Sequence, residues 1–180
     1  MTAPSASQPG STDAPSAPPR VEERATPWYV HAAAIALAVA LALWAHWRTL
    51  GYELLGFDTY LQIIAARIQS WDDFWGTFRE RLANGRIAAD FYRPVQNLSI
   101  ALDYALWGLR PLGYHISSLA VFGASVAAIY LLSRRLLGPR AWLGPLAAAL
   151  YFGLHPNQLQ IVPIPCRRSD MLVVLFLLLT

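Results

Sequence analysis

The sequence predicts an all-α, multi-span integral membrane protein. Of its 180 residues, 56% are hydrophobic and only 14% are charged, whereas about 25% of residues are charged in typical soluble domains. Long apolar runs also alternate with segments that hold most of the charge. We expect four transmembrane helices, the last one truncated, at about residues 28–47, 115–133, 141–156 and 171–180.

The N-terminal region is expected to be a disordered tail followed by an anchor. Residues 1–27 are rich in Ala, Pro, Ser and Thr and have little to bury. The first span then carries Trp28 and Tyr29 at one end and Trp44 and Trp47 at the other, which suits the two headgroup belts. A cleaved signal peptide is the competing interpretation. The long mixed-charge tail and the flanking aromatic residues favour an anchor.

Residues 48–114 are predicted to form a polar outer loop of short amphipathic helices. Asp58 could cap the first of these helices. The second begins with a capping box at Ser70-Trp71-Asp72-Asp73 and ends near Gly85. Pro94 fits the first turn of the third. We expect these helices to lie along the membrane surface. Their apolar faces comprise Leu61, Ile64, Ala65 and Ile68 in the first helix, and Val95, Leu98, Leu102, Ala105 and Leu109 in the third.

Arginine placement predicts the orientation in the membrane. Arg134, Arg135 and Arg140 follow the second span without an acidic residue, which places that connection in the cytoplasm. The N-terminus is then cytoplasmic, and the 48–114 loop lies outside together with a connector at residues 155–170. The apolar run after it covers only about half a crossing, so we expect residues 28–180 to be the incomplete N-terminal domain of a longer protein.

Composition excludes some functions. All 14 basic residues are arginine and the net charge is +3, but no basic cluster with interleaved aromatic residues occurs, so no nucleic-acid partner is expected. The single cysteine, Cys166, excludes an intramolecular disulfide and a cysteine-based metal site. The residues assign no cofactor and leave metal dependence unknown.

Candidate site residues gather near the span ends on the predicted outer face. Arginine forms bidentate bonds with phosphate oxygens, and a carboxylate can take a proton from an attacking hydroxyl. A lipid-phosphate substrate at headgroup depth would suit both groups. The candidates are Asp58, Arg93, His155, Arg167, Arg168 and Asp170.

Structural explanations exist for the same residues. Asp58 could be only an N-cap, and Arg93 could be a surface charge or pair with a loop acid such as Asp90 or Asp103. His155, followed by proline, could simply end the third span. The segment Arg167–Asp170 could be an interfacial anchor in which the aspartate caps the fourth span.

The order of several motifs resembles the N-terminal portion of a C-type membrane glycosyltransferase. The most similar branch is that of the protein O-mannosyltransferases and their relatives with tetratricopeptide repeats, and the resemblance covers about residues 28–180. The motifs are Gly56-Phe57-Asp58, Phe91-Tyr92-Arg93-Pro94, Leu98-Ser99, Leu102-Asp103-Tyr104, Gly113-Tyr114-His115, Arg135-Leu136-Leu137-Gly138, Leu154-His155-Pro156 and Arg168-Ser169-Asp170.

The resemblance implies a multi-pass enzyme of a bacterial-type plasma (inner) membrane. It would move a sugar from a polyprenyl-phosphate donor to a protein or glycan acceptor hydroxyl at the outer face, by direct displacement with inversion. Asp58 would be the catalytic base or would orient the acceptor. Substrate- or phosphate-binding residues would be Tyr92, Arg93, His155, Arg168 and Asp170.

The chain also departs from the pattern of this family. Thr59 stands where a second acid often follows the first, and Gln160 stands where the connector usually carries glutamate. Arg167 replaces a usual glycine. Two other functions therefore remain open at this point: a catalytically inert truncated paralogue or scaffold, and a lipid-phosphate transporter, which would need charged or broken helices at the bilayer midplane.

Overall fold

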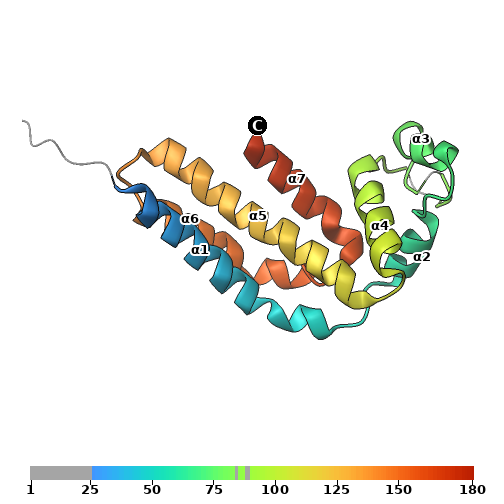
Figure 1. Cartoon of the computed structure of the whole chain (residues 1–180), viewed down its shortest axis with the longest axis horizontal. Coiled ribbons are helices and arrows are strands. Elements are labelled where there is room, and N and C mark those ends of the chain that lie inside the picture. The colour runs from blue at the N-terminus through green and yellow to red at the C-terminus, as the bar shows by residue number, and fades with distance from the viewer. Residues whose placement is uncertain (1–25, 84, 88–89) are drawn as a thin grey trace, which may run out of the picture.

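The computed structural model describes residues 26–83, 85–87 and 90–180, and all regular structure within these residues is helical (Figure 1). The expected all-α class is confirmed, whereas nearly all of the expected tail lies outside the described residues. The α-helices are α1 (Trp28–Ala45), α2 (Phe57–Ala65), α3 (Trp71–Arg79), α4 (Pro94–Trp107), α5 (Pro111–Leu137), α6 (Leu143–Leu154) and α7 (Arg168–Leu179). Three 3₁₀ turns join them: η1 (Trp47–Gly51), η2 (Pro156–Gln160) and η3 (Pro165–Arg167).

Two of the described helices are long and apolar enough to cross a membrane, by length and composition. The 18 residues of α1 extend about 27 Å and the 27 residues of α5 about 40 Å, against a hydrocarbon core of about 30 Å. Helices α6 and α7 have 12 residues each, or about 18 Å. All four predicted segments are therefore helical, but two of them are shorter than a full crossing.

Helix α5 lies at the centre of the long helices and contacts α1, α6 and α7 (Figure 1). Where α1 meets its neighbours, Ala34, Ala38 and Ala42 are buried at four-residue spacing on one face. Gly153 of α6 faces Ala42, and a Cβ added to this glycine would lie 2.8 Å from the Cβ of Ala42. Small residues thus let the two backbones approach closely, as is common between membrane helices.

A buried histidine ties the start of α1 to the far end of α5. The Nδ1 atom of His31 lies 2.8 Å from the Tyr130 hydroxyl, and its Nε2 atom lies 3.2 Å from the carbonyl oxygen of Pro139. A carbonyl oxygen can only accept, so Nε2 carries the proton and Nδ1 accepts from the tyrosine. The contact joins α1, α5 and the turn before α6 at the end predicted to face the cytoplasm.

The first predicted loop helix is present, but Asp58 does not cap it. The N-cap of α2 is Gly56, which makes no side-chain cap hydrogen bond and has a φ of +94°. That backbone conformation favours glycine over a residue with a Cβ. Asp58 instead occupies the first turn, where its negative charge interacts favourably with the helix dipole. The capping interpretation of Asp58 is therefore wrong.

The capping box of the second loop helix is confirmed. The Ser70 hydroxyl accepts from the backbone N–H of Asp73 at 3.1 Å, and the Asp73 carboxylate accepts from the backbone N–H of Ser70 at 3.1 Å. A further backbone N–H bond from Gln69, followed by Ser70 and the nearby Arg86 guanidinium, holds the pKa of Asp73 below its usual value. The predicted end near Gly85 is wrong, because α3 ends at Arg79 and extended backbone follows.

The third loop helix, α4, begins with Pro94 at its first position as predicted, but its buried face mixes polar residues with Ile100 and Ala101. Its polar residues Gln96, Asn97 and Asp103 are buried, while Leu102 and Leu106 are exposed. On α2 the predicted apolar face is likewise turned outward. Leu61 and Ile64 of that face are exposed, and so is Ile68, which was predicted to belong to this helix but lies beyond its end at Ala65.

We expect the close approach of α1 and α6 to tolerate no side chain at position 153. Gly153→Val would force its Cβ against Ala42, and overpacking of this kind typically costs about 1–3 kcal/mol. Thermal unfolding of the purified protein in detergent would measure the loss. The control is Gly51→Val, because nothing lies within 4 Å of a Cβ at Gly51. Equal unfolding midpoints for the two variants would contradict this account of the packing.

Candidate functional site

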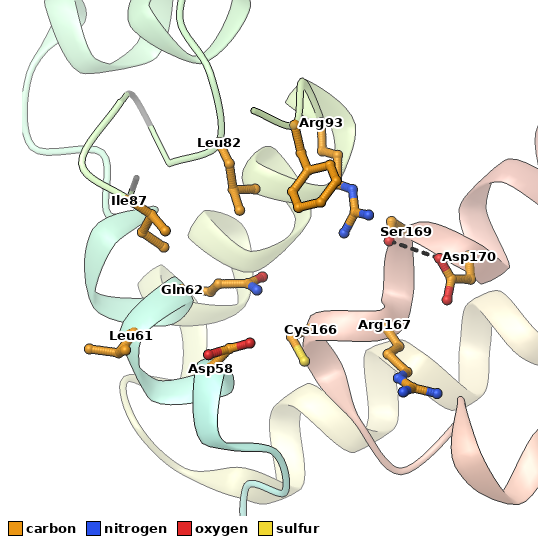
Figure 2. A pocket seen from close by; sticks show the side chains of 11 residues that line it. Asp58, Leu61, Gln62, Leu82, Ile87, Arg93, Cys166, Arg167, Ser169 and Asp170 are labelled. Atoms are coloured by element: carbon orange, nitrogen blue, oxygen red, sulfur yellow. Dashed lines mark hydrogen bonds between the residues drawn. The ribbon is translucent and has the colours of Figure 1, made fainter. Parts of the chain in front are cut away.

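A cavity of about 540 Å³ opens between α2, the start of α4 and the turn that leads into α7 (Figure 2). Its lining combines two carboxylates, two guanidinium groups, an amide and apolar side chains. Segments more than 100 residues apart in sequence supply these groups. The lining residues are Asp58, Leu61, Gln62, Leu82, Ile87, Phe91, Arg93, Cys166, Arg167, Ser169 and Asp170.

One buried amide holds the walls of the cavity together. The Nε2 group of Gln96 in α4 donates to the Gln62 side-chain oxygen of α2 at 3.0 Å and to the backbone carbonyl of Cys166 at 2.9 Å. Gly56 adds a second close contact, since a Cβ there would lie 3.3 Å from Ile164 and 3.6 Å from the Cys166 sulfur. The start of α2 and the approach to α7 are thus fixed against each other.

Asp58 projects from the α2 wall of the cavity, on the side opposite Ser169 and Asp170 (Figure 2). Its side chain is exposed, and among the described residues it makes no hydrogen bond or ion pair. An ionised carboxylate in this setting keeps its lone pairs available for a ligand. The group can therefore accept a proton or a hydrogen bond from a molecule in the cavity.

Arg93 lies in the same cavity as Asp58. It is the N-cap residue of α4, and its guanidinium carbon is 4.8 Å from the centre of the Phe91 ring. The alternative that Arg93 pairs with a loop acid is not what the structure shows, because Asp90 pairs with Arg81 and Asp103 pairs with Arg168. Stacking on an aromatic face leaves the edge of a guanidinium free to donate.

Arg168 is not a lining residue of this cavity, although its motif was expected at the site. Its side chain is fully buried, and its Nη1 group donates to the Asp103 carboxylate at 2.6 Å and to the Ser99 hydroxyl at 2.7 Å. Its Nη2 group donates to the Tyr114 carbonyl at 2.9 Å and to the Ser118 hydroxyl at 3.3 Å, and Nε donates to the same hydroxyl at 3.4 Å. All five donors of the guanidinium are therefore engaged within the fold.

The remaining predicted site residues are divided between this cavity and its surroundings. Asp170 lines the cavity from the first turn of α7 and accepts a hydrogen bond from the Ser169 hydroxyl. His155 lines a neighbouring cavity of about 260 Å³ that Asp170 also borders, and its Nδ1 accepts from the backbone N–H of Asn157. Tyr92 does not line the main cavity, since its hydroxyl donates to the Phe78 carbonyl.

Arg167 lines the cavity, although the resemblance pointed to its neighbour. Its side chain is exposed and its one hydrogen bond given by the structure runs to the Gln160 carbonyl oxygen at 3.4 Å. The adjacent pair Arg167-Arg168 was the signal in the sequence that could have indicated an arginine facing the cavity. Successive residues of a helix point about 100° apart, and here Arg167, the N-cap of α7, points outward whereas Arg168 is buried.

The other two positions that depart from the family pattern, Thr59 and Gln160, lie outside the lining of the main cavity. Thr59 is buried and its hydroxyl donates to the Leu55 carbonyl, so a carboxylate there would lack room for solvent. Gln160 is exposed. Over the described part of the chain, no three His, Cys, Asp or Glu side chains gather in a group that could hold a metal ion.

Curated proteins with similar sequences confirm the resemblance to one branch of glycosyltransferases. The chain is 32% identical over 110 residues to protein O-mannosyl-transferase TMTC2 of Mus musculus, and the match covers 61% of this chain and 12% of that protein. It is 33% identical over 100 residues to protein O-mannosyl-transferase Tmtc1 of Drosophila melanogaster, covering 56% and 11%. It is 34% identical over 123 residues to protein O-mannosyl-transferase TMTC4 of Homo sapiens, covering 60% and 16%.

These matches define the extent of the similarity. The matched segment spans only 12% of the length of the mouse protein and 11% of the fly protein. No protein-family profile matches the chain, and no solved structure matches it. The similarity therefore supports the O-mannosyltransferase branch through curated sequences alone.

We expect the buried pair of Arg168 and Asp103 to be essential for stability. Arg168→Met leaves the Asp103 carboxylate buried without its counter-ion, and breaking a buried pair in this way costs about 3–5 kcal/mol. The double variant Asp103→Leu with Arg168→Met removes both charges and should recover much of the loss. Arg167→Met, an exposed neighbour, is the control. Thermal unfolding in detergent measures all three, and equal stability of Arg168→Met and Arg167→Met would contradict the prediction.

Proposed function

We propose that residues 28–180 belong to the membrane domain of a glycosyltransferase that moves a sugar from a polyprenyl-phosphate donor to an acceptor hydroxyl. One observation carries this proposal: Asp58 and Arg93, neither of them ion-paired among the described residues, line the same cavity. The names of the similar proteins support mannose as the sugar and a protein as the acceptor.

The transfer reaction needs a carboxylate that acts as a base and a cation that binds the phosphate. Asp58 takes the proton of the acceptor hydroxyl as the hydroxyl oxygen attacks the anomeric carbon of the sugar. The bond from that carbon to the phosphate oxygen breaks, the phosphate leaves with the electron pair, and the configuration inverts. Arg93 donates charge-assisted hydrogen bonds to the phosphate oxygens, which stabilises the negative charge that develops on the leaving group.

The membrane arrangement proposed for this function places the cavity at the outer surface. Helices α1, α5, α6 and α7 would be the four spans of a plasma-membrane protein, with the N-terminus and the Arg134–Arg140 turn in the cytoplasm. The loop carrying α2, α3 and α4 would lie on the outer face. Its exposed apolar side chains, among them Trp71 and Trp75, suit the headgroup layer.

We expect Asp58→Asn to reduce sugar transfer far more than Asp72→Asn. Each aspartate is exposed and stands in the first turn of a short loop helix, so the two changes remove the same charge from similar positions. Only Asp58 lines the cavity. Loss of a general base typically lowers a rate by about 10²–10⁴. Transfer of radiolabelled mannose from a polyprenyl-phosphate donor, measured in membranes with equal amounts of each variant, tests this. Wild-type rates for Asp58→Asn would exclude it as the base.

Labelling of single cysteines tests the proposed orientation. In a Cys166→Ser background, Glu80→Cys in the outer loop should react with a membrane-impermeant maleimide added to intact cells. Leu136→Cys, at the cytoplasmic end of α5, should react only after permeabilisation. Both positions are exposed, so access to the reagent should depend on the side of the membrane. The opposite labelling pattern would reverse the assignment.

A further inference from the structure

The cavity contains a second cation, Arg167, that lies outside the motifs of the family resemblance. We propose that Arg167 and Arg93 together bind the phosphate group of a lipid-linked phosphodiester, one from each side of the cavity. This inference rests on the proposed function, whose site and donor class it makes more specific. In this proposal Arg167 contacts the phosphate, and the buried Arg168 fixes the backbone that carries Arg167.

The two guanidinium groups come from separate elements. Arg93 stands at the start of α4, and Arg167 ends the η3 turn and is the N-cap residue of α7. Figure 2 shows Arg93 extending from the start of α4 and Arg167 from the turn below it, with the Arg167 guanidinium directed away from Asp58, which lies on the opposite wall in α2. An anion held by both arginines would need the exposed Arg167 side chain to turn toward Arg93, and it would leave Asp58 for the group attached to the phosphate.

Both guanidinium groups have donors to offer. The structure gives Arg167 one hydrogen bond, a long one of 3.4 Å to a backbone carbonyl, and gives the Arg93 side chain the Phe91 ring as its contact. Within the described ranges, no carboxylate lies in salt-bridge distance of either. The cost of breaking existing contacts on ligand binding is therefore small, because exposed or weakly bonded arginines lose few contacts when they turn toward a ligand.

The backbone that carries Arg167 is held in place from two directions. On one side the Gln96 amide bonds to the carbonyl of Cys166, and on the other the buried Arg168 is bonded to α4 and α5. A cation on a fixed backbone loses less conformational freedom on binding than one on a mobile loop. The same anchoring keeps Arg167 on the outer side of the turn.

The charges of the cavity suit a phosphodiester. Two arginines and two aspartates line it, so its formal charge without ligand is zero. A phosphate that links a lipid to a sugar carries one negative charge and would bring the total to −1, whereas a phosphate monoester with two charges would bring it to −2. Bidentate guanidinium contacts also favour a phosphate-bearing lipid over a neutral one.

Direct binding measurements test this inference. The protein would be purified in phosphatidylcholine nanodiscs, and the dissociation constant of a short-chain prenyl phosphomannose would be measured for wild type, Arg93→Gln, Arg167→Gln and Arg79→Gln. Arg79 is exposed at the end of α3 and does not line the cavity, so it is the control. Loss of a charge-assisted hydrogen bond is worth about 1.5–3 kcal/mol, so each cavity variant should bind about tenfold or more weakly. The control should bind as wild type does.

The outcomes separate this inference from the function on which it rests. Wild-type affinity in Arg167→Gln, with weakened binding in Arg93→Gln, would overturn the role of Arg167 and leave the proposed function standing. No binding by the wild type would overturn both. Equal affinity for inorganic phosphate and for the prenyl phosphomannose would mean that the site takes a free anion, which overturns the lipid-linked ligand. Unchanged unfolding midpoints would show that the variants fold.

Discussion

The buried ion pair between Arg168 and Asp103 is the interaction on which the rest of this structure depends. Two charges removed from water are stable only when they are paired and fully hydrogen-bonded, and here three helices supply the partners: Asp103 and Ser99 from α4, Tyr114 and Ser118 from α5, and the arginine from α7. Asp103 also accepts from the Ser117 hydroxyl at 2.6 Å. These requirements determine how the loop helix α4 docks on the long helices, and the cavity follows from that docking.

The orientation of α4 follows from the same network. Because Asp103 and Gln96 face inward beside Ile100, leucines of α4 such as Leu102 and Leu106 are left on the outer face. In water this would expose leucines at a cost, whereas beside a bilayer the same face is solvated by lipid or headgroups. Buried polar bonds and an outward row of leucines suit the interfacial position that we propose for α4. The cavity would share that position, because α4 provides one of its walls.

Local signals in the sequence predicted most of the helices. Ser70 with Asp73 and Pro94 are helix-start signals whose physics is confined to a few neighbouring residues, and both were confirmed. The errors came from contacts that are distant in sequence. Asp58 lost the capping role because the backbone at Gly56 turns to meet Ile164 and Cys166, more than 100 residues away. The sequence analysis expected Arg168 at the cavity, whereas Arg167 lines it and Arg168 is buried. Which of the two faces the cavity depends on how α7 is rotated about its axis, and local sequence patterns do not determine that rotation. The sequence analysis placed Asp58, Arg93 and Asp170 in one site, and the structure shows all three in the lining of one cavity.

The Gln96 amide has a mechanical consequence. Since one nitrogen bonds to both Gln62 and the Cys166 carbonyl, a displacement of the α7 turn would pull on α2 as well as on α4. Loss of this one amide would therefore remove two cross-links of the cavity at once, the one from α4 to α2 and the one from α4 to the turn before α7.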